Sequence, residues 1–274
     1  MTALTWLYVP GDRPEVVTKA LAAGADVVVI DLEDAVAPDR KEYAREATAD
    51  RLTDPQPIPV HVRVNALDGP LAATDLAALA ALPGVSGLRL PKVTSPDQIT
   101  RIAETTAPAD GGAPPLYALL ETALGIERAY DIATAHPALR GIALGEADLR
   151  ADLNLRDDTS LDWPRSRVVV AARAARLPPP PQSVHPDIRD LDGLEASCAH
   201  GRALGFLGRA AIHPRQLPVI ERAYLPTERE IEEAETVVKA ATVNEGAQAL
   251  PSGTFIDAAV VAQAHRVLAL ARRR

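Results

Sequence analysis

Five charged residues recur along the chain at intervals close to 30 residues. They are Glu33, Arg63, Lys92, Glu121 and Asp148, and successive members lie 30, 29, 29 and 27 residues apart. His185 and His213, 28 residues apart, continue the series. Such an interval is the length of one strand-helix unit, so these side chains should occupy equivalent positions on consecutive parallel strands. Gathered at one edge of a sheet, they could bind a metal ion and an anionic ligand together.

The two carboxylates Glu121 and Asp148 follow adjacent predicted strands, whose backbones lie about 4.8 Å apart in a sheet. Carboxylates held so close repel each other, and one tends to keep a proton. A divalent cation removes that penalty. Oxygen ligands without a cysteine or histidine cluster suit Mg²⁺, with Mn²⁺ also possible. The alternative is that each carboxylate pairs with an arginine or lysine across the rim.

Arg63 lies in the otherwise apolar run VHVRVNA. A guanidinium keeps its charge, so it needs an anionic partner there. That partner is a substrate carboxylate or the acidic cluster at residues 31–34, and both can apply. Alternation along the strand places Asp31 and Glu33 of that cluster on one face. For Lys92 we expect neutralisation of this acidic region rather than binding of an anion.

The elements that must position these residues are short β-branched runs alternating with longer alanine-rich stretches, which is typical of parallel strand-helix units. The expected strands are Leu4–Val9, Val27–Leu32, Pro59–Val64, Gly87–Leu90, Leu116–Leu120, Gly141–Leu144, Gln182–Val184 and Gly208–Ile212. The expected helices between them are Pro14–Ala23, Arg40–Leu52, Asp75–Ala81, Pro96–Thr105, Gly125–Ala135, Ser166–Arg176 and Asp192–Leu204. Eight such units predict an α/β protein with a TIM-type (β/α)8 barrel, whose polar residues lie at the carboxyl ends of the strands. A doubly wound open sheet is the alternative, disfavoured because no Gly-x-Gly-x-x-Gly follows the first strand.

About sixty residues follow the last expected strand. They predict a helix over Thr227–Val243, a loop over Asn244–Gly253 and a terminal helix over Ile256–Arg272. We therefore expect a catalytic barrel domain over residues 1–225 and a C-terminal helical extension over 226–274. The extension either caps the barrel or packs on a neighbouring subunit. The proline run at 177–182 is expected to be a stiff connector.

Composition narrows the class of protein further. A net charge of -8 gives no support to nucleic-acid binding, so an anionic ligand needs a local basic pocket. One cysteine, Cys198, excludes an internal disulfide framework and a multi-cysteine metal site. No stretch reaches the roughly 20 apolar residues of a membrane span, and the start MTALTWLYVPGDRPE lacks the features of a signal peptide. A cytoplasmic protein is expected.

Eight short motifs, in order, resemble the citrate lyase β-subunit branch of the HpcH/HpaI aldolase family. They are LYVPGDRPE, VVVIDLEDAVAPDRK, VRVNA, LRLPKV, LLETALGI, LGEADL, HPDIRDLDGL and AIHPRQLPVI, and the resemblance extends from about Leu4 to the C-terminus. It implies a Mg²⁺-dependent carbon–carbon lyase on a modified TIM barrel, a homotrimer or hexamer, acting on acyl-thioesters such as citryl-, malyl- or citramalyl-CoA.

The resemblance also implies residue roles. Glu121 and Asp148 become the metal ligands, with Glu121 also facing the substrate, and Arg63 becomes the clamp for the substrate carboxylate. The segment SGTFIDAAVV resembles one that carries an aspartate into the active site of a neighbouring subunit, which makes Asp257 the catalytic proton-handling group. The alternative for Asp257 is a plain helix N-cap.

For the CoA part of a substrate, the resemblance places Tyr8 and the turn at Ile212 and His213 along the acyl-CoA site. Ordinary hydrogen bonding at the barrel rim is an equal alternative for His213. Some relatives carry a lysine after the VPG motif that meets CoA phosphates, whereas this chain has Glu15 there. Arg13 and Lys19 remain the candidate basic partners.

The expected function is cleavage or formation of a 3-hydroxy-acyl-CoA, with a 2-oxo acid and an acyl-CoA as the other partners. One alternative is an aldolase on free hydroxy-oxo acids. Another is a citrate lyase complex subunit that acts on a carrier-protein thioester. A non-catalytic barrel that binds a dicarboxylate is a third, but the joint presence of Arg63, Glu121, Asp148 and Asp257 argues against it.

Overall fold

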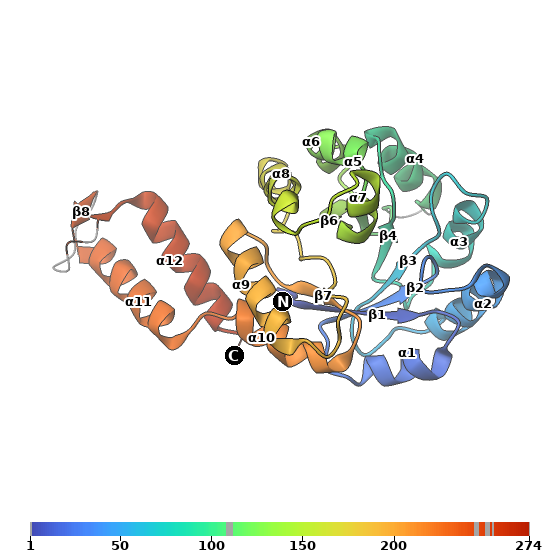
Figure 1. The fold of residues 1–274 in the computed structure, drawn as a ribbon, viewed down its shortest axis with the longest axis horizontal. Coiled ribbons are helices and arrows are strands. Elements are labelled where there is room, and N and C mark those ends of the chain that lie inside the picture. Colours follow the sequence, from blue (N-terminus) through green and yellow to red (C-terminus); the bar gives the residue numbers. More distant parts are fainter. Residues whose placement is uncertain (1, 108–111, 244–246, 250–252, 254, 274) are drawn as a thin grey trace. The chain divides into compact units, whose positions relative to one another are not determined.

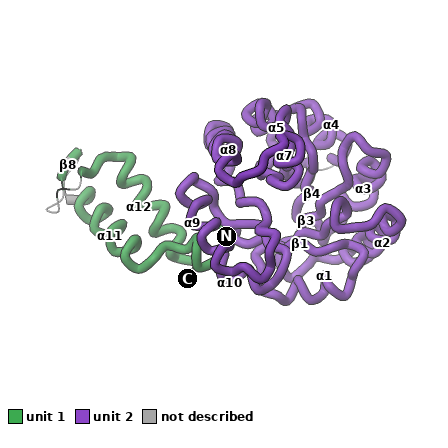
Figure 2. Tube along the Cα trace, viewed as in Figure 1, with its two compact units in different colours: residues 1–2, 221–274 green, residues 3–220 purple. Residues whose placement is uncertain are grey.

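The computed structural model describes residues 2–107, 112–243, 247–249, 253 and 255–273. The chain forms two compact units (Figure 2). One comprises Ala3–Ile220, and the other comprises Met1–Thr2 and Glu221–Arg274. In the described part, no helix is both long enough and apolar enough to cross a lipid bilayer.

A seven-stranded parallel sheet forms the centre of the larger unit (Figure 1). Its strands are β1 Thr5–Pro10, β2 Val27–Asp31, β3 Val60–Arg63, β4 Gly87–Leu90, β5 Leu116–Leu120, β6 Leu139–Leu144 and β7 Arg209–Ala211. They lie in the order β6-β5-β4-β3-β2-β1-β7. This confirms the α/β class and the parallel sheet, since seven of the eight expected strands form.

The expected closed barrel is wrong in one place, because Gln182–Val184 does not form a strand. Gln182 makes only an isolated parallel bridge with Arg209, in which its N–H donates to the carbonyl of Gly208 at 2.9 Å. Four prolines at 178–181 lack the N–H groups that a longer ladder needs. In the described residues no ladder joins this segment to β6. The sheet is therefore a half-barrel with an open seam.

Alternation along the strands separates an apolar face from a polar one. On β4, Leu88 and Leu90 are fully buried, whereas Arg89 between them points to the other face. That face is the concave one, since Arg89 hydrogen-bonds to Tyr8 of β1 although β2 and β3 lie between the two strands. The core lies on the apolar side, under the surrounding helices (Figure 1).

The helices of the larger unit mostly follow the expected pattern. They are α1 Pro14–Leu21, α2 Lys41–Leu52, α3 Ala72–Leu79, α4 Pro96–Thr106, α5 Ala123–Glu127, α6 Ala129–Ala133, α7 Glu146–Asp152, α8 Asp162–Ala174, α9 Leu191–Leu204 and α10 Leu217–Tyr224, the last of which runs into the second unit. The single helix expected over Gly125–Ala135 is two short ones that meet at Arg128. Helix α4 begins with a capping box between Ser95 and Gln98, with Pro96 at its first position.

The C-terminal unit is a helical hairpin with a small antiparallel ribbon. Helices α11 (Glu228–Val243) and α12 (Ala258–Ala271) flank strands β8 (Gln248–Ala249) and β9 (Phe255–Ile256). Ile256 is thus the end of a strand and not the start of the terminal helix. Most of the loop expected over Asn244–Gly253 lies outside the described residues.

Candidate functional site

Four side chains stand in register across the concave face of the sheet. Asp31 of β2 pairs with Arg63 of β3, Arg63 with Arg89 of β4, and Arg89 with Tyr117 of β5. Residues paired in this way share one face of a sheet. At the carboxyl ends of the strands, Lys92 contacts both Glu33 and Glu121, and Arg63 contacts Glu33. Charged residues that follow β2, β4 and β5 therefore meet beside Arg63 of β3 in one polar region, as the 30-residue spacing predicts.

Arg63 is fully engaged by the acidic cluster of β2. Its Nε and Nη2 donate to the two carboxylate oxygens of Asp31 at 2.7 and 2.6 Å. Its Nη1 lies 3.0 Å from Glu33 Oε2 and donates to Asp34 Oδ2 at 3.2 Å. The structural pairing is thus present in the molecule. The clamp for a substrate carboxylate stays a prediction.

Lys92 connects two carboxylates of the site. Its ammonium donates to Glu33 Oε1 at 2.7 Å, and its backbone N–H donates to Glu121 Oε1 at 2.7 Å. Its φ of 52° lies in the left-handed region, which costs a residue with a Cβ about 1 kcal/mol or more. Burial raises the pKa of Glu33, against the pull of Arg63 and Lys92. Lys92 thus neutralises the acidic region, which is the role expected from sequence.

Glu121 is almost completely buried, with 2% of the residue exposed. Burial raises its pKa to about 8, and repulsion from Glu33 and Asp148 adds to the effect. Gly145, which directly follows β6, allows this placement. A Cβ at Gly145 would lie 2.2 Å from Glu121 Oε2. The glycine therefore lets the carboxylate pass directly against the backbone.

Asp148 and Glu146 both lie in the first turn of α7, but only Asp148 is available to a ligand. Glu146 accepts two hydrogen bonds from the buried Arg165, from its Nε and its Nη2, both at 2.9 Å. Asp148 is half-buried, and no described residue hydrogen-bonds or ion-pairs with its side chain. The site thus presents two carboxylates, Glu121 and Asp148, whose negative charges repel each other.

This pair fits a hard divalent cation. Its donors are oxygens. A cation would favour the ionised form of Glu121, whose pKa is raised first by burial and then by repulsion from Glu33 and Asp148. Within the described ranges, no group of three or more histidine, cysteine, aspartate or glutamate side chains could hold a metal ion. Waters or a ligand must therefore supply the remaining coordination positions, which is the usual situation for Mg²⁺.

Substitution of Gly145 by alanine tests the placement of Glu121. The added methyl group should push the carboxylate away from its position and weaken Mg²⁺ binding by about tenfold or more. Isothermal titration with Mg²⁺ measures the effect, and Gly112→Ala is the control, because a Cβ there would have no other atom of the described residues within 4 Å, its chain neighbours aside. Equal Mg²⁺ affinities in the two variants would contradict this reading of the site.

Tyr8 and Arg13 both belong to the end of β1 at which the site lies, whereas Lys19 does not. Tyr8 is half-buried, and its ring centroid lies 5.6 Å from the Arg63 guanidinium carbon. Arg13 precedes α1 and is exposed. Lys19 lies in the last turn of α1, about 8 Å further along the helix and away from that edge. Of the two candidate basic residues, Arg13 is therefore the better placed.

Ile212 and His213 follow β7, and a buried glutamine fixes this turn. Gln216 accepts a hydrogen bond from Ile212 N at 2.9 Å and donates to the carbonyl of His185 at 2.9 Å. His213 Nδ1 accepts from Arg215 N at 3.1 Å, so the imidazole caps the short helix Pro214–Gln216. This is the rim hydrogen bonding that sequence offered as the alternative for His213.

Asp257 belongs to the C-terminal unit and caps α12. Its Oδ1 accepts hydrogen bonds from Ala259 N and Val260 N, both at 2.9 Å. The N-cap role is therefore real, and the catalytic role remains a prediction. The structure brings Arg63, Glu121, Asp148 and Tyr8 together in one unit and places Asp257 in the other.

The sequence reasoning missed two residues that shape this region. Arg89 lies in the motif LRLPKV and Gly145 in the motif LGEADL, but the sequence analysis assigned no role to either residue. The alternation of LRL does place an arginine on the same face as Arg63, and that signal was available. The need for glycine at 145 follows only from the three-dimensional approach of Glu121.

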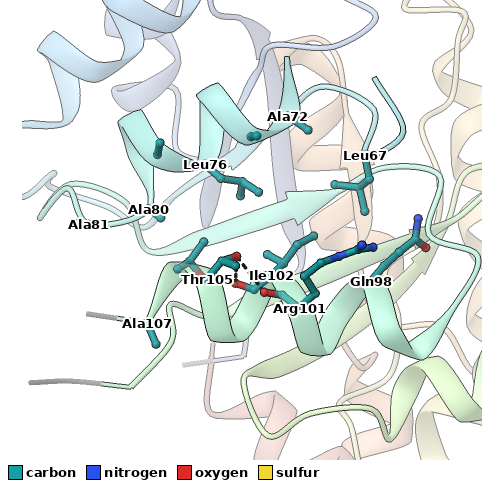
Figure 3. Close-up of a pocket in the computed structure, with 13 residues that line it drawn as sticks. Leu67, Ala72, Leu76, Ala80, Ala81, Gln98, Arg101, Ile102, Thr105 and Ala107 are labelled. Carbon is teal, nitrogen blue, oxygen red and sulfur yellow. Dashed lines mark hydrogen bonds between the residues drawn. The ribbon is translucent and has the colours of Figure 1, made fainter. Parts of the chain in front are cut away.

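The cavity in Figure 3 is not this site. It has a volume of about 660 Å³ and lies between α3 and α4, on the outer side of the sheet. Alanines and leucines line most of it, and Arg101 is the only charged residue among the described lining residues. None of these described residues carries a carboxylate that could bind a cation, so the candidate metal site is the one at the strand ends.

Comparison with known proteins gives consistent results. Residues 4–214 match the HpcH/HpaI aldolase/citrate lyase family. A (3S)-malyl-CoA thioesterase of Cereibacter sphaeroides is 36% identical over 240 residues, which cover 85% of this chain and 81% of that protein.

Solved structures agree with the sequence comparison. The CitE protein of Mycobacterium tuberculosis in complex with magnesium, acetoacetate and coenzyme A has a TM-score of 0.83 and 34% identity, and the match covers 98% of each chain. A citrate lyase beta subunit of the same organism, in complex with oxaloacetate and magnesium, has a TM-score of 0.70 and 36% identity, with 82% of this chain and 97% of that chain covered.

Proposed function

The chain belongs to the HpcH/HpaI aldolase/citrate lyase family of lyases and aldolases, and from this premise we propose that it is a Mg²⁺-dependent carbon–carbon lyase. Its substrate is a 3-hydroxy-acyl-CoA such as citramalyl-, malyl- or citryl-CoA, which it cleaves to a 2-oxo acid and an acyl-CoA, or forms from them. One observation carries the proposal. Glu121 and Asp148 form a repelling, partly buried carboxylate pair at the strand ends, beside an anion-pairing arginine.

Glu121 and Asp148 are the residues that would hold the metal. When bound, Mg²⁺ supplies a positive charge that stabilises negative charge developing on a substrate oxygen. Similar proteins support this choice, because two of them were crystallised with magnesium together with acetoacetate or oxaloacetate. Mn²⁺ has the same preference for oxygen ligands and is the substitute we expect to be accepted.

Arg63 is the proposed partner of the substrate carboxylate. Its guanidinium lies among Asp31, Glu33 and Asp34, and 12% of its side chain is exposed. Asp34 is the most exposed acidic partner, at 55% of its side chain. A substrate carboxylate could replace Asp34 at the Nη1 group while the paired hydrogen bonds to Asp31 hold the guanidinium in place.

Asp257 is the proposed base, supplied by a neighbouring subunit. In the cleavage direction it takes the proton of the 3-hydroxyl group, the bond between C2 and C3 breaks, and the electron pair passes to the thioester as an enolate. Protonation of that enolate yields the acyl-CoA. A base from a neighbouring subunit requires an oligomer, and we propose a homotrimer or hexamer because the resemblance to the family implies one. The cytoplasmic location stays a prediction from the single cysteine.

The CoA portion is proposed to lie along the end of β1 and the turn after β7. Tyr8, Ile212 and His213 line this path, and Arg13, with a smaller part for Lys19, meets the phosphates. The complex of the similar M. tuberculosis protein with coenzyme A supports a CoA thioester over a free hydroxy-oxo acid.

A second candidate function is hydrolysis of the thioester, because a similar protein is named (3S)-malyl-CoA thioesterase. A third is action on a carrier-protein thioester, as in a citrate lyase complex, since another similar protein is named citrate lyase beta subunit. The three differ in their products and in the group that carries the acyl chain.

A panel of malyl-, citramalyl- and citryl-CoA, each with and without Mg²⁺, separates the lyase from the thioesterase. We expect release of a 2-oxo acid and an acyl-CoA from one of them, and a loss of about 10³-fold or more when EDTA replaces Mg²⁺. Release of free CoA and the intact hydroxy acid would instead indicate a thioesterase. Turnover that ignores Mg²⁺ would contradict the proposed mechanism.

A further inference from the structure

Arg89 is a buried charge to which the proposed reaction assigns no role. It is 2% exposed, and within the described part of the chain no carboxylate lies within 4.0 Å of it. Its Nε has no hydrogen-bond partner. Its neighbour in the sheet, Arg63, is surrounded by three carboxylates. Because an unpaired buried arginine is destabilising, its presence calls for a different explanation from that of Arg63.

The guanidinium of Arg89 lies between two aromatic rings. Its central carbon is 5.7 Å from the centroid of Tyr8 and 5.6 Å from that of Tyr117. His61 stacks on Tyr117 at 4.4 Å, and burial, with the charge of Arg89, holds the pKa of His61 well below its ordinary range. The charge of Arg89 is therefore stabilised by cation–π contacts with these two rings and is not neutralised by a carboxylate of the described residues.

Arg89 directs a hydrogen bond to a residue of the candidate substrate site. Its Nη1 donates to the phenol oxygen of Tyr8 at 3.3 Å. With that lone pair engaged, Tyr8 must turn its own proton elsewhere, and no described residue accepts it. Tyr8 is half-buried and faces the end of the sheet where Arg63 lies. Its hydroxyl is thus a donor that remains open to a ligand.

From this geometry we propose that Arg89 is a positioning residue that acts through Tyr8, so that the Tyr8 hydroxyl donates to a ligand oxygen that carries or gains negative charge. Hydrogen bonds in a chain strengthen one another, and a positive charge behind the phenol makes its proton a better donor. Preorganised donors of this kind stabilise developing oxyanions. The inference rests on the proposed function for the identity of the ligand, which is a 2-oxo acid or an acyl-CoA thioester.

Tyrosine labelled with ¹³C at the ζ carbon provides a test that does not depend on turnover. The chain has five tyrosines, and comparison with Tyr8→Phe assigns the Tyr8 resonance. We expect this resonance to move when Mg²⁺ is added with pyruvate, or with acetyl-CoA, and the ligand that moves it identifies the source of the oxygen. In Arg89→Met the movement should be lost, and in Arg89→Lys partly restored. A resonance that stays in place in wild type, or moves equally in Arg89→Met, overturns the proposal.

Stability distinguishes this role from a structural one. Arg89→Met removes a buried charge that has no carboxylate partner, so its Tm should equal or exceed that of wild type. Arg209→Met is the matched control, since Arg209 on β7 is likewise buried, at 3% exposed, but its Nη1 donates to two side chains, Gln182 Oε1 at 3.2 Å and Ser197 Oγ at 2.9 Å, which methionine would leave without this donor. That variant should lower Tm, and in it the Tyr8 resonance should still move on addition of the ligand as it does in wild type. If Arg89→Met lowers Tm strongly and the Tyr8 resonance still moves as in wild type, then Arg89 only supports the fold.

A double-mutant cycle completes the test in the active enzyme. Tyr8→Phe should lower kcat by about 10²-fold and Arg89→Met by about tenfold or more, with KM little changed. In the Tyr8→Phe background, Arg89→Met should add less than about threefold. Independent, multiplying effects would overturn action through Tyr8. If wild type cleaves no thioester but the Tyr8 resonance responds as expected, the proposed function fails and this inference stands.

Discussion

Substitution of Glu121 by glutamine should abolish stabilisation of the protein by Mg²⁺ and make the metal-free protein at least as stable as wild type. Glutamine keeps the acceptor for the N–H of Lys92 but removes a buried charge that Glu33 and Asp148 repel. The raised pKa of about 8 means that the folded state holds the proton of Glu121 more tightly than the unfolded chain. Ionisation of Glu121 is therefore destabilising as pH rises above 4.5, and the full effect is present above about 8.

Thermal unfolding at pH 9 with EDTA, and again with Mg²⁺, measures both parts of this expectation. Without metal, the Tm of Glu121→Gln should not fall below that of wild type, and we expect it to rise by roughly 2 °C or more. With Mg²⁺ only wild type should gain stability, and Asp148→Asn should behave like Glu121→Gln. Turnover in both variants should fall by about 10³-fold or more.

Glu146→Gln is the matched control, since it changes a carboxylate of the same segment that is bound to Arg165. It should lower Tm, because the buried Arg165 loses a paired anion, but it should keep the Mg²⁺-dependent gain. A normal Mg²⁺-dependent gain in both Glu121→Gln and Asp148→Asn would disprove the metal assignment.

The second large effect is expected for Asp257→Asn. Turnover should fall by roughly 10²-fold or more, while Mg²⁺ and the 2-oxo acid still bind. Asparagine is as good an N-cap as aspartate, so α12 should keep its two capping hydrogen bonds and Tm should change little. The comparison therefore separates loss of a base from loss of a helix cap. Asp190→Asn, which changes the N-cap of α9, is the control and should leave turnover near that of wild type.

Mixed oligomers test whether Asp257 acts on a neighbouring subunit. Asp257→Asn and Glu121→Gln subunits are each inactive alone, but together they should recover part of the activity if each site combines residues of two chains. Absence of recovery in verified mixed oligomers would exclude the shared site. Near-normal turnover of Asp257→Asn by itself would exclude the catalytic role.

The hydrophobic pattern of the sequence correctly predicted most of the strands. The runs VVVID and LYALL become the buried strands β2 and β5, and the spacing of the charged residues placed Glu121 and Lys92 at neighbouring strand ends. The segment at 182–184 has the composition of a strand, yet the preceding prolines and the absence of a ladder to β6 leave it as a single bridge. Strand formation there depends on partners that a single-sequence pattern does not reveal.

Contacts across the sheet are beyond this kind of reasoning. Arg89 and Tyr8 are 81 residues apart, and two strands separate them, so their hydrogen bond depends on the curvature of the whole sheet. The pairing of Glu146 with Arg165 likewise depends on the packing of α8 beside β6. The sequence analysis named only Asp148 in LGEADL, and the structure shows that the other carboxylate of this motif, Glu146, is paired with Arg165.

The short connection between β4 and α4 leaves little freedom to change its length or the residue at position 92. Connections of this kind ordinarily tolerate insertions and deletions, and a position at φ 52° would ordinarily suit glycine. Here Lys92 must offer its amide to one carboxylate and its ammonium to another, so glycine would lose the second contact. Adding or removing one residue before Lys92 would shift both groups at once. The length of this connection is therefore as much a part of the site as the acidic residues that it joins.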